Sequence, residues 1–255
     1  MEKKKRKIVS IIMPCYNAQY YISESINSII KQTFKSWELI IVDDFSNDNT
    51  KEIIISYSFI DDRIKIIENN KNLGVAKSRN KGLKSANGRY IAFCDSDDLW
   101  EETKLSKQVI LLKKYSVVCS NYYLINNKGI RLKYIKGPKI IGYDQMLNSN
   151  YIPNSSAIFN KKLVNTNIEQ KNIGHEDYLM WLDLLRPNKK VFRIQEPLMS
   201  YRVHNNSISF NKLKSVFWTW NIYTKELKLN FFKSTQLMII NLMENIKKRF
   251  ITSSL

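Results

Sequence analysis

Three carboxylates within four residues follow a short apolar run in the stretch IAFCDSDDLW, residues 91–100. These acids are Asp95, Asp97 and Asp98. Like charges at this spacing repel one another, and partial burial at the end of a strand removes hydration from each of them. A bound cation would relieve both effects. The stretch therefore predicts a cation site, and hard carboxylate oxygens favour Mg²⁺ or Mn²⁺ as the ion.

Two further acidic pairs occupy positions that suit chemistry. Asp43 and Asp44 follow the apolar run WELIIV, and Glu176 and Asp177 begin the segment EDYLMWLDLL. A helix that starts near residue 174 places Asp177 on the same face as Trp181, so its carboxylate would point inward. An inward carboxylate in a crevice can serve as a general base.

Each acidic group also has a simpler structural explanation, and these alternatives stay open at this point. Residues 95–98 could cap a helix that begins near Leu99, because Asp is favoured at N-caps and in first turns. Glu176 and Asp177 could serve only the dipole of their helix, and Asp43 and Asp44 could form only a turn.

Short apolar runs alternate with helix-like segments through the first hundred residues. This alternation predicts a mainly parallel sheet that is covered by helices on both faces. Ligands bind such sheets at the carboxyl ends of the strands, so the segments 14–17, 43–44 and 95–98 are expected to meet in one crevice. The predicted strands are 8–13, 37–42, 63–68 and 89–94, and the predicted helices are 20–32, 50–59 and 75–85.

After Trp100, strand-like and helix-like segments no longer alternate regularly. From residue 211 onward, aromatic residues, lysines and helical periodicity predict a C-terminal helical region. The other predictions are helices at 101–115 and 174–186, strands at 117–125 and 155–159, a basic loop or hairpin at 131–142, and a strand pair or extended segment at 191–203.

Composition limits the class of protein. The formal net charge of +18 predicts an anionic partner, which could be nucleic acid, anionic lipid or a phosphorylated substrate. Three separated cysteines form neither a disulfide framework nor a paired zinc motif, so a reducing, cytoplasmic location is expected. The apolar run near the N-terminus is broken at Pro14 and makes a poor signal peptide, and no apolar run approaches the roughly 20 residues of a membrane span.

Five sequence blocks resemble those of bacterial family 2 glycosyltransferases in their order and approximate spacing. The resemblance implies a GT-A fold, which is a Rossmann-like α/β domain with a mostly parallel sheet flanked by helices. This domain would span residues 1–210, with a basic helical extension at 211–255. The blocks are VSIIMPCYN (9–17), ELIIVDDFSNDNT (38–50), NLGVAKSRNKGLKSANGRYIAFCDSDDLW (72–100), HEDYLMWLDLL (175–185) and PLMSYRVHNNSIS (197–209).

The resemblance also implies an activity. The enzyme would invert the anomeric centre while it moves a sugar from a nucleotide-diphospho-sugar to a hydroxyl of a glycan or lipid-linked acceptor. A UDP-sugar is the first expectation for the donor, with hexose and N-acetylhexosamine left open. The product would belong to a surface polysaccharide such as lipopolysaccharide or capsule.

The residues that match the family's donor site lie in the first two blocks. Pro14, Tyr16 and Asn17 match the loop that lines the nucleoside pocket. Asp43 matches the carboxylate that accepts a hydrogen bond from the base, and Asp44 is expected to support the same loop.

The later blocks match residues around the diphosphate and the metal. Arg79 matches a basic residue near the diphosphate, and Asp95, Ser96 and Asp97 form the DXD motif, with Asp97 as the expected direct ligand of Mn²⁺ or Mg²⁺. His204 aligns with a segment that closes over the diphosphate, either as a metal ligand or as a phosphate donor.

The resemblance assigns the catalytic base to the last acidic pair. Asp177 matches the carboxylate that takes the proton from the acceptor hydroxyl, and Glu176 is its neighbour in the same motif. A base is needed because the hydroxyl must lose its proton as it attacks the anomeric carbon.

The segment 231–250 carries an apolar stripe formed by Ile239, Leu242, Met243, Ile246 and Phe250, with basic residues beside it. Two interpretations are equally consistent with this pattern. The helix could pack on the catalytic domain, or it could lie on an anionic membrane, where each basic residue contributes roughly 1 kcal/mol.

A different class of function also has to be weighed. The basic composition, together with aromatic residues among the C-terminal lysines, would suit a nucleic-acid-binding protein or a metal-dependent nucleotidyltransferase. Carboxylate clusters at strand ends would repel a phosphate backbone unless a metal intervened, and neither class explains the five blocks. We therefore expect no nucleic-acid partner.

Overall fold

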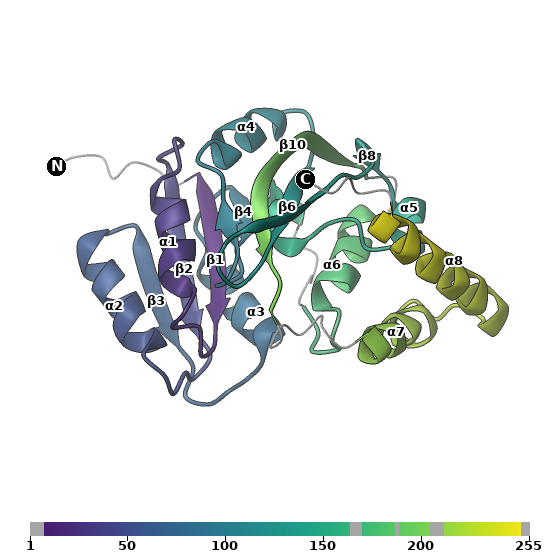
Figure 1. The fold of residues 1–255 in the computed structure, drawn as a ribbon, viewed down its shortest axis with the longest axis horizontal. Helices are drawn as coiled ribbons and strands as arrows, with labels where there is room; N and C mark the ends of the chain where they lie inside the picture. The colour runs from purple at the N-terminus through teal and green to yellow at the C-terminus, as the bar shows by residue number, and fades with distance from the viewer. Residues whose placement is uncertain (1–7, 164–169, 187–188, 205–211, 251–255) are drawn as a thin grey trace.

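The computed structural model describes residues 8–163, 170–186, 189–204 and 212–250. These residues form one central sheet in the order β3-β2-β1-β4-β9-β6-β10-β5, with β7 paired to β6 and β8 to β10 (Figure 1). The strands are β1 (Val9–Cys15), β2 (Trp37–Asp43), β3 (Ile64–Glu68), β4 (Tyr90–Phe93), β5 (Leu99–Trp100), β6 (Val117–Ile125), β7 (Arg131–Ile135), β8 (Ile140–Ile141), β9 (Ile158–Asn160) and β10 (Val191–Arg202).

The sheet is mostly parallel, as the alternating pattern predicts. β1 pairs in parallel with β2 and β4, β2 pairs in parallel with β3, and β10 pairs in parallel with β6 over most of its length. Antiparallel pairing joins β9 to β4 and to β6. Since Cys15 stands opposite Asp43 in the register, the carboxyl ends of β1 and β2 reach the same edge of the sheet.

Helices cover both faces of the sheet because its strands are apolar on both sides. Alternate residues of β1 point to opposite faces of the sheet and belong to different cores. Ile11 lies in the core between the sheet and the helices α1 (Ile22–Ile30), α2 (Thr50–Ile60) and α4 (Lys104–Leu111). Ile12 lies in the core on the opposite face. That second face is covered by α3 (Val75–Ser85), α5 (Tyr143–Asn148), α6 (Glu176–Leu185) and α8 (Phe231–Phe250).

The helix after the acidic stretch begins later than its sequence pattern predicts. Leu99 and Trp100 form β5, which pairs with β10, and α4 begins only at Lys104 after its N-cap Thr103. The interpretation of residues 95–98 as a helix cap is therefore wrong. The acidic loop instead lies between two strands of the same sheet.

Three other segments have a more specific form than their sequence patterns predict. Residues 191–202 form one long strand with register shifts near Pro197, which agrees with the extended-segment alternative and not with a strand pair. In the 131–142 region, β7 forms a hairpin with β6, but β8 pairs with β10, so the two short strands do not pair with each other. The predicted strand at 155–159 is preceded by a 3-10 turn, and β9 begins at Ile158.

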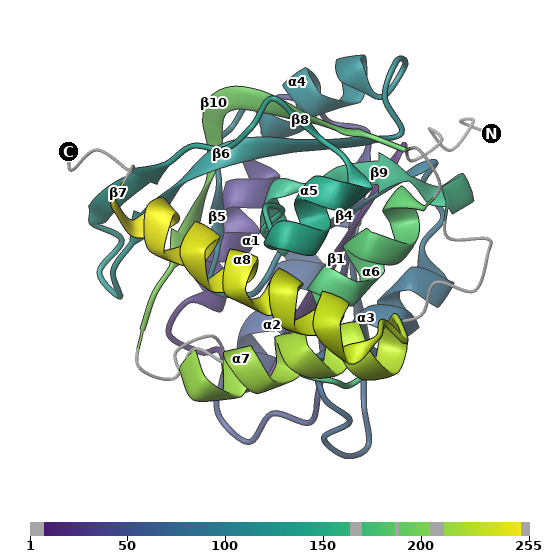
Figure 2. The same ribbon diagram turned by 90° about the vertical axis from the view of Figure 1, so that its right-hand side faces the viewer.

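The C-terminal helices lie at the opposite end of the molecule from β3 and α2 (Figure 1). α7 (Lys212–Asn221) continues into a π-helical turn (Ile222–Glu226), and α8 runs beside α7 and across α5 (Figure 2). In the part of the chain that the structure describes, every helix is too short or too polar to cross a bilayer.

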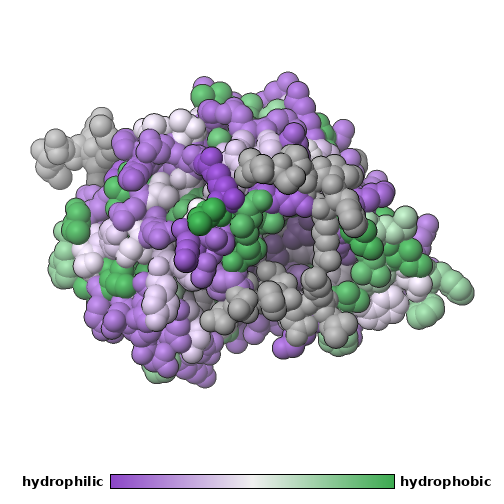
Figure 3. Space-filling view, viewed as in Figure 1, coloured by the Kyte–Doolittle hydropathy of each residue, from purple (hydrophilic) through white to green (hydrophobic). Residues whose placement is uncertain are grey.

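α8 packs on the domain, but through residues other than those of the predicted apolar stripe. One face of the helix is buried against the domain through Leu237 and Met238. The predicted stripe lies on another face, and the structure leaves Ile239, Met243 and Ile246 each more than half exposed. Apolar surface accordingly gathers over α8, at the right-hand end of Figure 3.

Candidate active site

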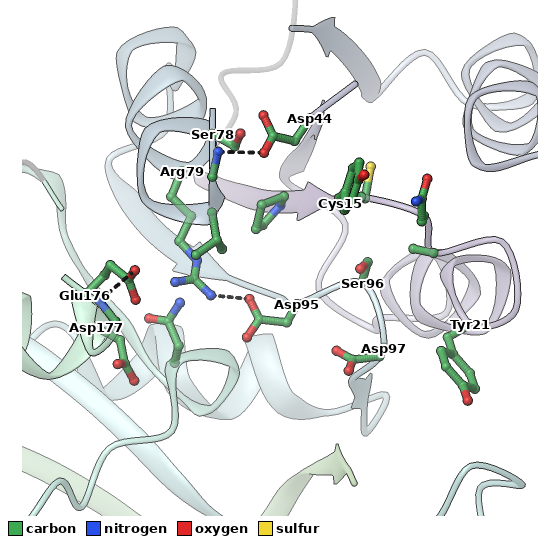
Figure 4. A pocket seen from close by; sticks show the side chains of 18 of the residues that line it. Cys15, Tyr21, Asp44, Ser78, Arg79, Asp95, Ser96, Asp97, Glu176 and Asp177 are labelled. Carbon is green, nitrogen blue, oxygen red and sulfur yellow. Dashed lines mark hydrogen bonds and ion pairs between the residues drawn. The ribbon is translucent and has the colours of Figure 1, made fainter. Parts of the chain in front are cut away.

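A cavity of about 740 Å³ opens at the carboxyl ends of β1 and β4. One part is lined by the loops that follow these strands and by the start of α3, and another by the start of α6 (Figure 4). Trp218 of α7 also lines the cavity. The predicted site residues that line it are Pro14, Tyr16, Asn17, Asp44, Arg79, Asp95, Ser96, Asp97, Glu176, Asp177 and His204.

The loop after β1 presents its side chains to this cavity. Tyr16 is 49% exposed, and Asn17 adopts a left-handed backbone conformation with φ of 49°. The amide of Asn17 donates to the Ser46 hydroxyl (3.0 Å), and its side-chain oxygen accepts from the Asn47 amide (2.9 Å). These bonds tie the loops after β1 and β2 together.

The two acids at the end of β2 face different partners. Asp43 is buried and accepts hydrogen bonds from the amide and the hydroxyl of Ser46, so in this structure it shapes the loop and is absent from the cavity lining. Asp44 accepts from the Asn69 side chain and from the amides of Leu73 and Gly74. The Asp44 carboxylate thereby fixes the start of α3, whereas the role predicted for Asp44 is to support the loop after β1.

Arg79 of α3 is a buried cation at the centre of the cavity. Its Nη2 lies 2.6 Å from Asp95 Oδ1, and its Nη1 donates to Gln170. Burial opposes the charge, but the carboxylate of Asp95 and, more weakly, those of Asp177 and Glu176 raise the pKa of Arg79. Figure 4 shows the guanidinium between the DXD motif and the Glu176–Asp177 pair.

Asp97 faces the far side of the motif, where it meets His204. His204 Nε2 lies 3.0 Å from Asp97 Oδ2. Burial, followed by the charge of Asp95, raises the pKa of Asp97, although His204 acts in the opposite direction. The structure therefore separates the two acids of the motif: Asp95 binds a protein cation, and Asp97 pairs with an imidazole.

The pair formed by Asp97 and His204 fits a metal that is shared with a substrate. Over the described residues, no group of three or more His, Cys, Asp or Glu side chains is placed to hold an ion. A carboxylate oxygen and an imidazole nitrogen supply two ligands, and Mg²⁺ or Mn²⁺ in such sites takes its remaining ligands from water and substrate phosphates. The repulsion between Asp95 and Asp97 favours a cation at this position.

Glu176 and Asp177 begin α6 at the other wall of the cavity. Glu176 is buried and its Oε1 accepts from the amide of Gly174, whereas Asp177 is partly exposed and its Oδ2 accepts from the Asn150 side chain. Both are first-turn acids, as the helix-dipole interpretation holds, and both also line the cavity. The more accessible Asp177 is the better placed of the two to take a proton.

Glycine is required where the chain enters α6. Gly174 has φ of +95°, and a Cβ there would lie 2.2 Å from the Trp218 ring of α7. The indole therefore sits directly on the backbone that precedes the acidic pair. Trp218 and His175, whose rings meet edge to face, complete this wall of the cavity.

Sequence reasoning missed several residues that hold the site. Arg202 lies within the matched block 197–209, but the resemblance implies no role for it, and Glu24, Gln170 and Trp218 carry no local sequence signal. Glu24 and Arg202 form an ion pair across 178 positions of the chain. Spacing cannot predict contacts at such separation, so only the fold reveals them.

Comparisons with known proteins agree with this geometry. Residues 10–170 match the family model described as glycosyl transferase family 2. The sequence is 37% identical to TuaG of Bacillus subtilis (strain 168), which bears the name of a teichuronic acid biosynthesis glycosyltransferase, over 96% of this chain and 98% of that protein. It is 38% identical to WfgD of Escherichia coli, named as a UDP-Glc:alpha-D-GlcNAc-diphosphoundecaprenol beta-1,3-glucosyltransferase, over 84% of this chain and 85% of WfgD.

The fold is also similar to a solved structure. Residues 1–349 of TarS from S. aureus, solved in complex with UDP-GlcNAc, superpose with a TM-score of 0.73 at 22% sequence identity. The match covers 92% of this chain and 71% of the TarS chain. At this identity the likeness concerns the GT-A fold.

Proposed function

The chain belongs to glycosyltransferase family 2, and from this membership we propose that it transfers a sugar from a UDP-sugar to a hydroxyl of a lipid-linked glycan. The acceptor would belong to bacterial surface polysaccharide synthesis, such as that of lipopolysaccharide or capsule. The extensive identity to WfgD supports both the donor and the acceptor class. The observation that carries the proposal is that the acidic loop and the Glu176–Asp177 pair line one and the same cavity from different sides.

The proposed reaction breaks the bond between the sugar and the diphosphate while the acceptor oxygen attacks the anomeric carbon. A divalent cation held by Asp97 and His204 would supply neutralising charge to the leaving diphosphate. Asp177 would take the proton of the attacking hydroxyl from the opposite wall. Attack from the face opposite the leaving group inverts the anomeric centre, so this arrangement supports an inverting reaction.

The loops after β1 and β2 would hold the nucleotide. Pro14, Tyr16 and Asn17 offer the apolar and polar groups of a nucleoside pocket, and Ser96 lies in the wall next to the metal pair. Asp43 would receive the base only if its bonds to Ser46 are exchanged on binding. Arg79 would act on the diphosphate through its charge and through its hold on Asp95.

A donor screen tests the proposed activity. The purified protein would be given Mn²⁺, a synthetic polyprenyl diphosphate that carries one sugar, and each of UDP-glucose, UDP-galactose, UDP-GlcNAc, UDP-GalNAc and GDP-mannose. We expect the sugar to be transferred to the acceptor from one or more of the UDP-sugars and not from GDP-mannose. Duplex DNA serves as a control ligand, and it should leave the melting temperature unchanged where UDP with Mn²⁺ raises it. Transfer from GDP-mannose alone would contradict the proposed donor.

A lipid-linked acceptor would bring the enzyme to the cytoplasmic face of a membrane, and α8 suits that location. Its exposed stripe contains Ile239, Leu242, Met243 and Ile246. Residues 212–250 include eight basic and two acidic residues, so this region is cationic as well as apolar. Helices with these two properties bind anionic interfaces through apolar insertion and charge attraction. We therefore include peripheral membrane binding in the proposed function.

Replacing the stripe with polar side chains is expected to release the protein from membranes. Ile239→Gln, Met243→Gln and Ile246→Gln combined should lower the bound fraction in co-sedimentation with phosphatidylglycerol vesicles, since three apolar groups no longer enter the interface. Added salt should weaken binding of the unaltered protein.

The matched control changes apolar residues that are even more exposed but lie far from α8. Phe59→Gln with Ile60→Gln alters side chains that are 86% and 78% exposed at the end of α2. This variant should bind vesicles like the unaltered protein. Equal loss of binding in both variants would show that surface apolarity in general, and not α8, drives the association.

A further inference from the structure

Arg202, the last residue of β10, binds the backbone of the acidic loop. Its Nε donates to the carbonyl of Asp97 (2.8 Å), and its amide donates to Asp98 Oδ1 (3.1 Å). The side chain is fully buried, and Nη1 also donates to the carbonyls of Asn126 and Asn127. Arg202 thus holds the loop at two consecutive residues, Asp97 through its guanidinium and Asp98 through its backbone amide.

The same guanidinium is linked to α1. Nη2 lies 2.6 Å from Glu24 Oε2, and the cation stands 4.7 Å from the centre of the Tyr21 ring. Tyr21 in turn stacks on the His204 imidazole, with ring centroids 5.3 Å apart. One tyrosine ring therefore contacts both the cation that holds Asp97 and the imidazole that pairs with it.

This arrangement bears on the positions of Asp97 and His204. The acids Asp95, Asp97 and Asp98 repel one another, so their loop would spread apart if nothing held it. Arg202 places a buried positive charge against the loop. Its rigid guanidinium donates through Nε to the loop and through the other nitrogens to Asn126, Asn127 and Glu24, so the position of Asp97 is fixed relative to those groups. Because His204 follows Arg202 by two residues, Arg202 also restricts the position of the His204 backbone, from which the imidazole extends.

From these contacts we propose that Arg202 and Tyr21 are positioning residues for the metal pair. Arg202 sets the location of Asp97, and Tyr21 sets the orientation of the His204 ring, so the two ligands stand 3.0 Å apart before any ion binds. The inference rests on the proposed metal role of Asp97 and His204. It adds that metal affinity depends on groups that do not contact the ion.

Arg202→Lys tests this role because lysine keeps the charge but loses the planar fork. Loss of an outer partner typically lowers metal affinity about 10- to 100-fold. We expect the Mn²⁺ affinity, measured by electron paramagnetic resonance with saturating UDP, to fall by that order. The affinity for UDP in EDTA should stay close to that of the unaltered protein.

Arg193→Lys provides the matched control. Arg193 is a buried arginine of the same strand, but its guanidinium donates to the carbonyls of Ser120 and Tyr151, away from the acidic loop. This variant should lose thermal stability without a change in Mn²⁺ affinity. If both lysine variants lower Mn²⁺ affinity equally, the effect is one of general destabilisation and the proposal is wrong.

Tyr21 gives a second test that does not alter a buried charge. Tyr21→Phe keeps the ring and should keep the Mn²⁺ affinity, whereas Tyr21→Leu removes the stacking partner of His204 and should weaken it. Unchanged affinity in both Tyr21→Leu and Arg202→Lys would overturn the positioning role. Unaltered protein that binds UDP equally well in Mn²⁺ and in EDTA would instead overturn the metal role itself.

Discussion

Asp177→Asn is expected to lower the rate of sugar transfer by about 10²- to 10⁴-fold, which is the usual contribution of a general base. Asparagine keeps the shape of the side chain and can still meet Asn150, but it cannot take a proton from the acceptor hydroxyl. Asp177 lies across the cavity from the metal pair, so the affinities for UDP and Mn²⁺ should stay near those of the unaltered protein. Steady-state transfer rates and calorimetry with UDP measure the two effects separately.

Glu176→Gln is the neighbouring control, and its effect should be milder. The Oε1 of Glu176 accepts a hydrogen bond from the Gly174 amide, and the glutamine oxygen can accept the same bond. Glu176 is therefore engaged in the turn that precedes α6, through its bond to the Gly174 amide. Asp177 is partly exposed and lines the cavity. If Glu176→Gln were the more damaging change, the base would be assigned to the wrong carboxylate. If both variants lost UDP binding, the pair would belong to the donor site.

The strand and helix pattern of the first hundred residues could be predicted because each element carries its own periodic signal. The helix at Val75–Ser85 has the predicted bounds, and β1 and β2 differ from prediction by one or two residues at their ends. The helix expected from residue 101 begins late because Leu99 and Trp100 pair with β10, which is a contact across a hundred residues. Local pattern carries no information about such pairing.

The α8 stripe shows another limit of periodicity. Its sequence has apolar residues on two faces, and a pattern alone cannot say which face meets the domain. The structure buries Leu237 and Met238 and exposes Ile239 and Met243, because α5 and the π-helical turn cover only one side of the helix. The stripe residues Ile239, Met243 and Ile246 are exposed together, whereas α8 packs on the domain through Leu237 and Met238.

The acidic motif could be located from sequence, and the family resemblance names Asp97 as its expected metal ligand, but the protein partners of the two acids could not be predicted. Asp95 and Asp97 are equivalent as letters in a DXD pattern. In the fold, Asp95 lies against Arg79 and Asp97 lies against His204, and these partners come from α3 and from the end of β10. Because Arg79 occupies the carboxylate of Asp95, the proposal assigns the ion shared with a substrate to Asp97.

Asp97→Asn is expected to abolish the gain in UDP affinity that Mn²⁺ provides. The donor diphosphate and the loop are both anionic, so only a bridging cation makes their approach favourable. Asparagine keeps an oxygen beside His204 but removes the charge that holds the ion. Calorimetry should then give the variant the same UDP affinity in Mn²⁺ as in EDTA, whereas the unaltered protein binds more tightly in Mn²⁺.

The fold of this variant should remain intact, and its melting temperature in EDTA should not fall. Burial and the charge of Asp95 raise the pKa of Asp97 in the folded protein. A carboxyl whose pKa is raised by folding destabilises the protein when it is ionised above that pKa, so its neutral replacement removes a cost at neutral pH. Asp61→Asn is the control, because it breaks an ion pair with Arg63 at the far end of α2 and should leave the Mn²⁺ effect unchanged. If the gain in UDP affinity with Mn²⁺ survived in Asp97→Asn and disappeared in Asp95→Asn, Asp95 would be the metal ligand. Arg79, which is paired with Asp95 in this structure, would then have to release that carboxylate when the donor binds.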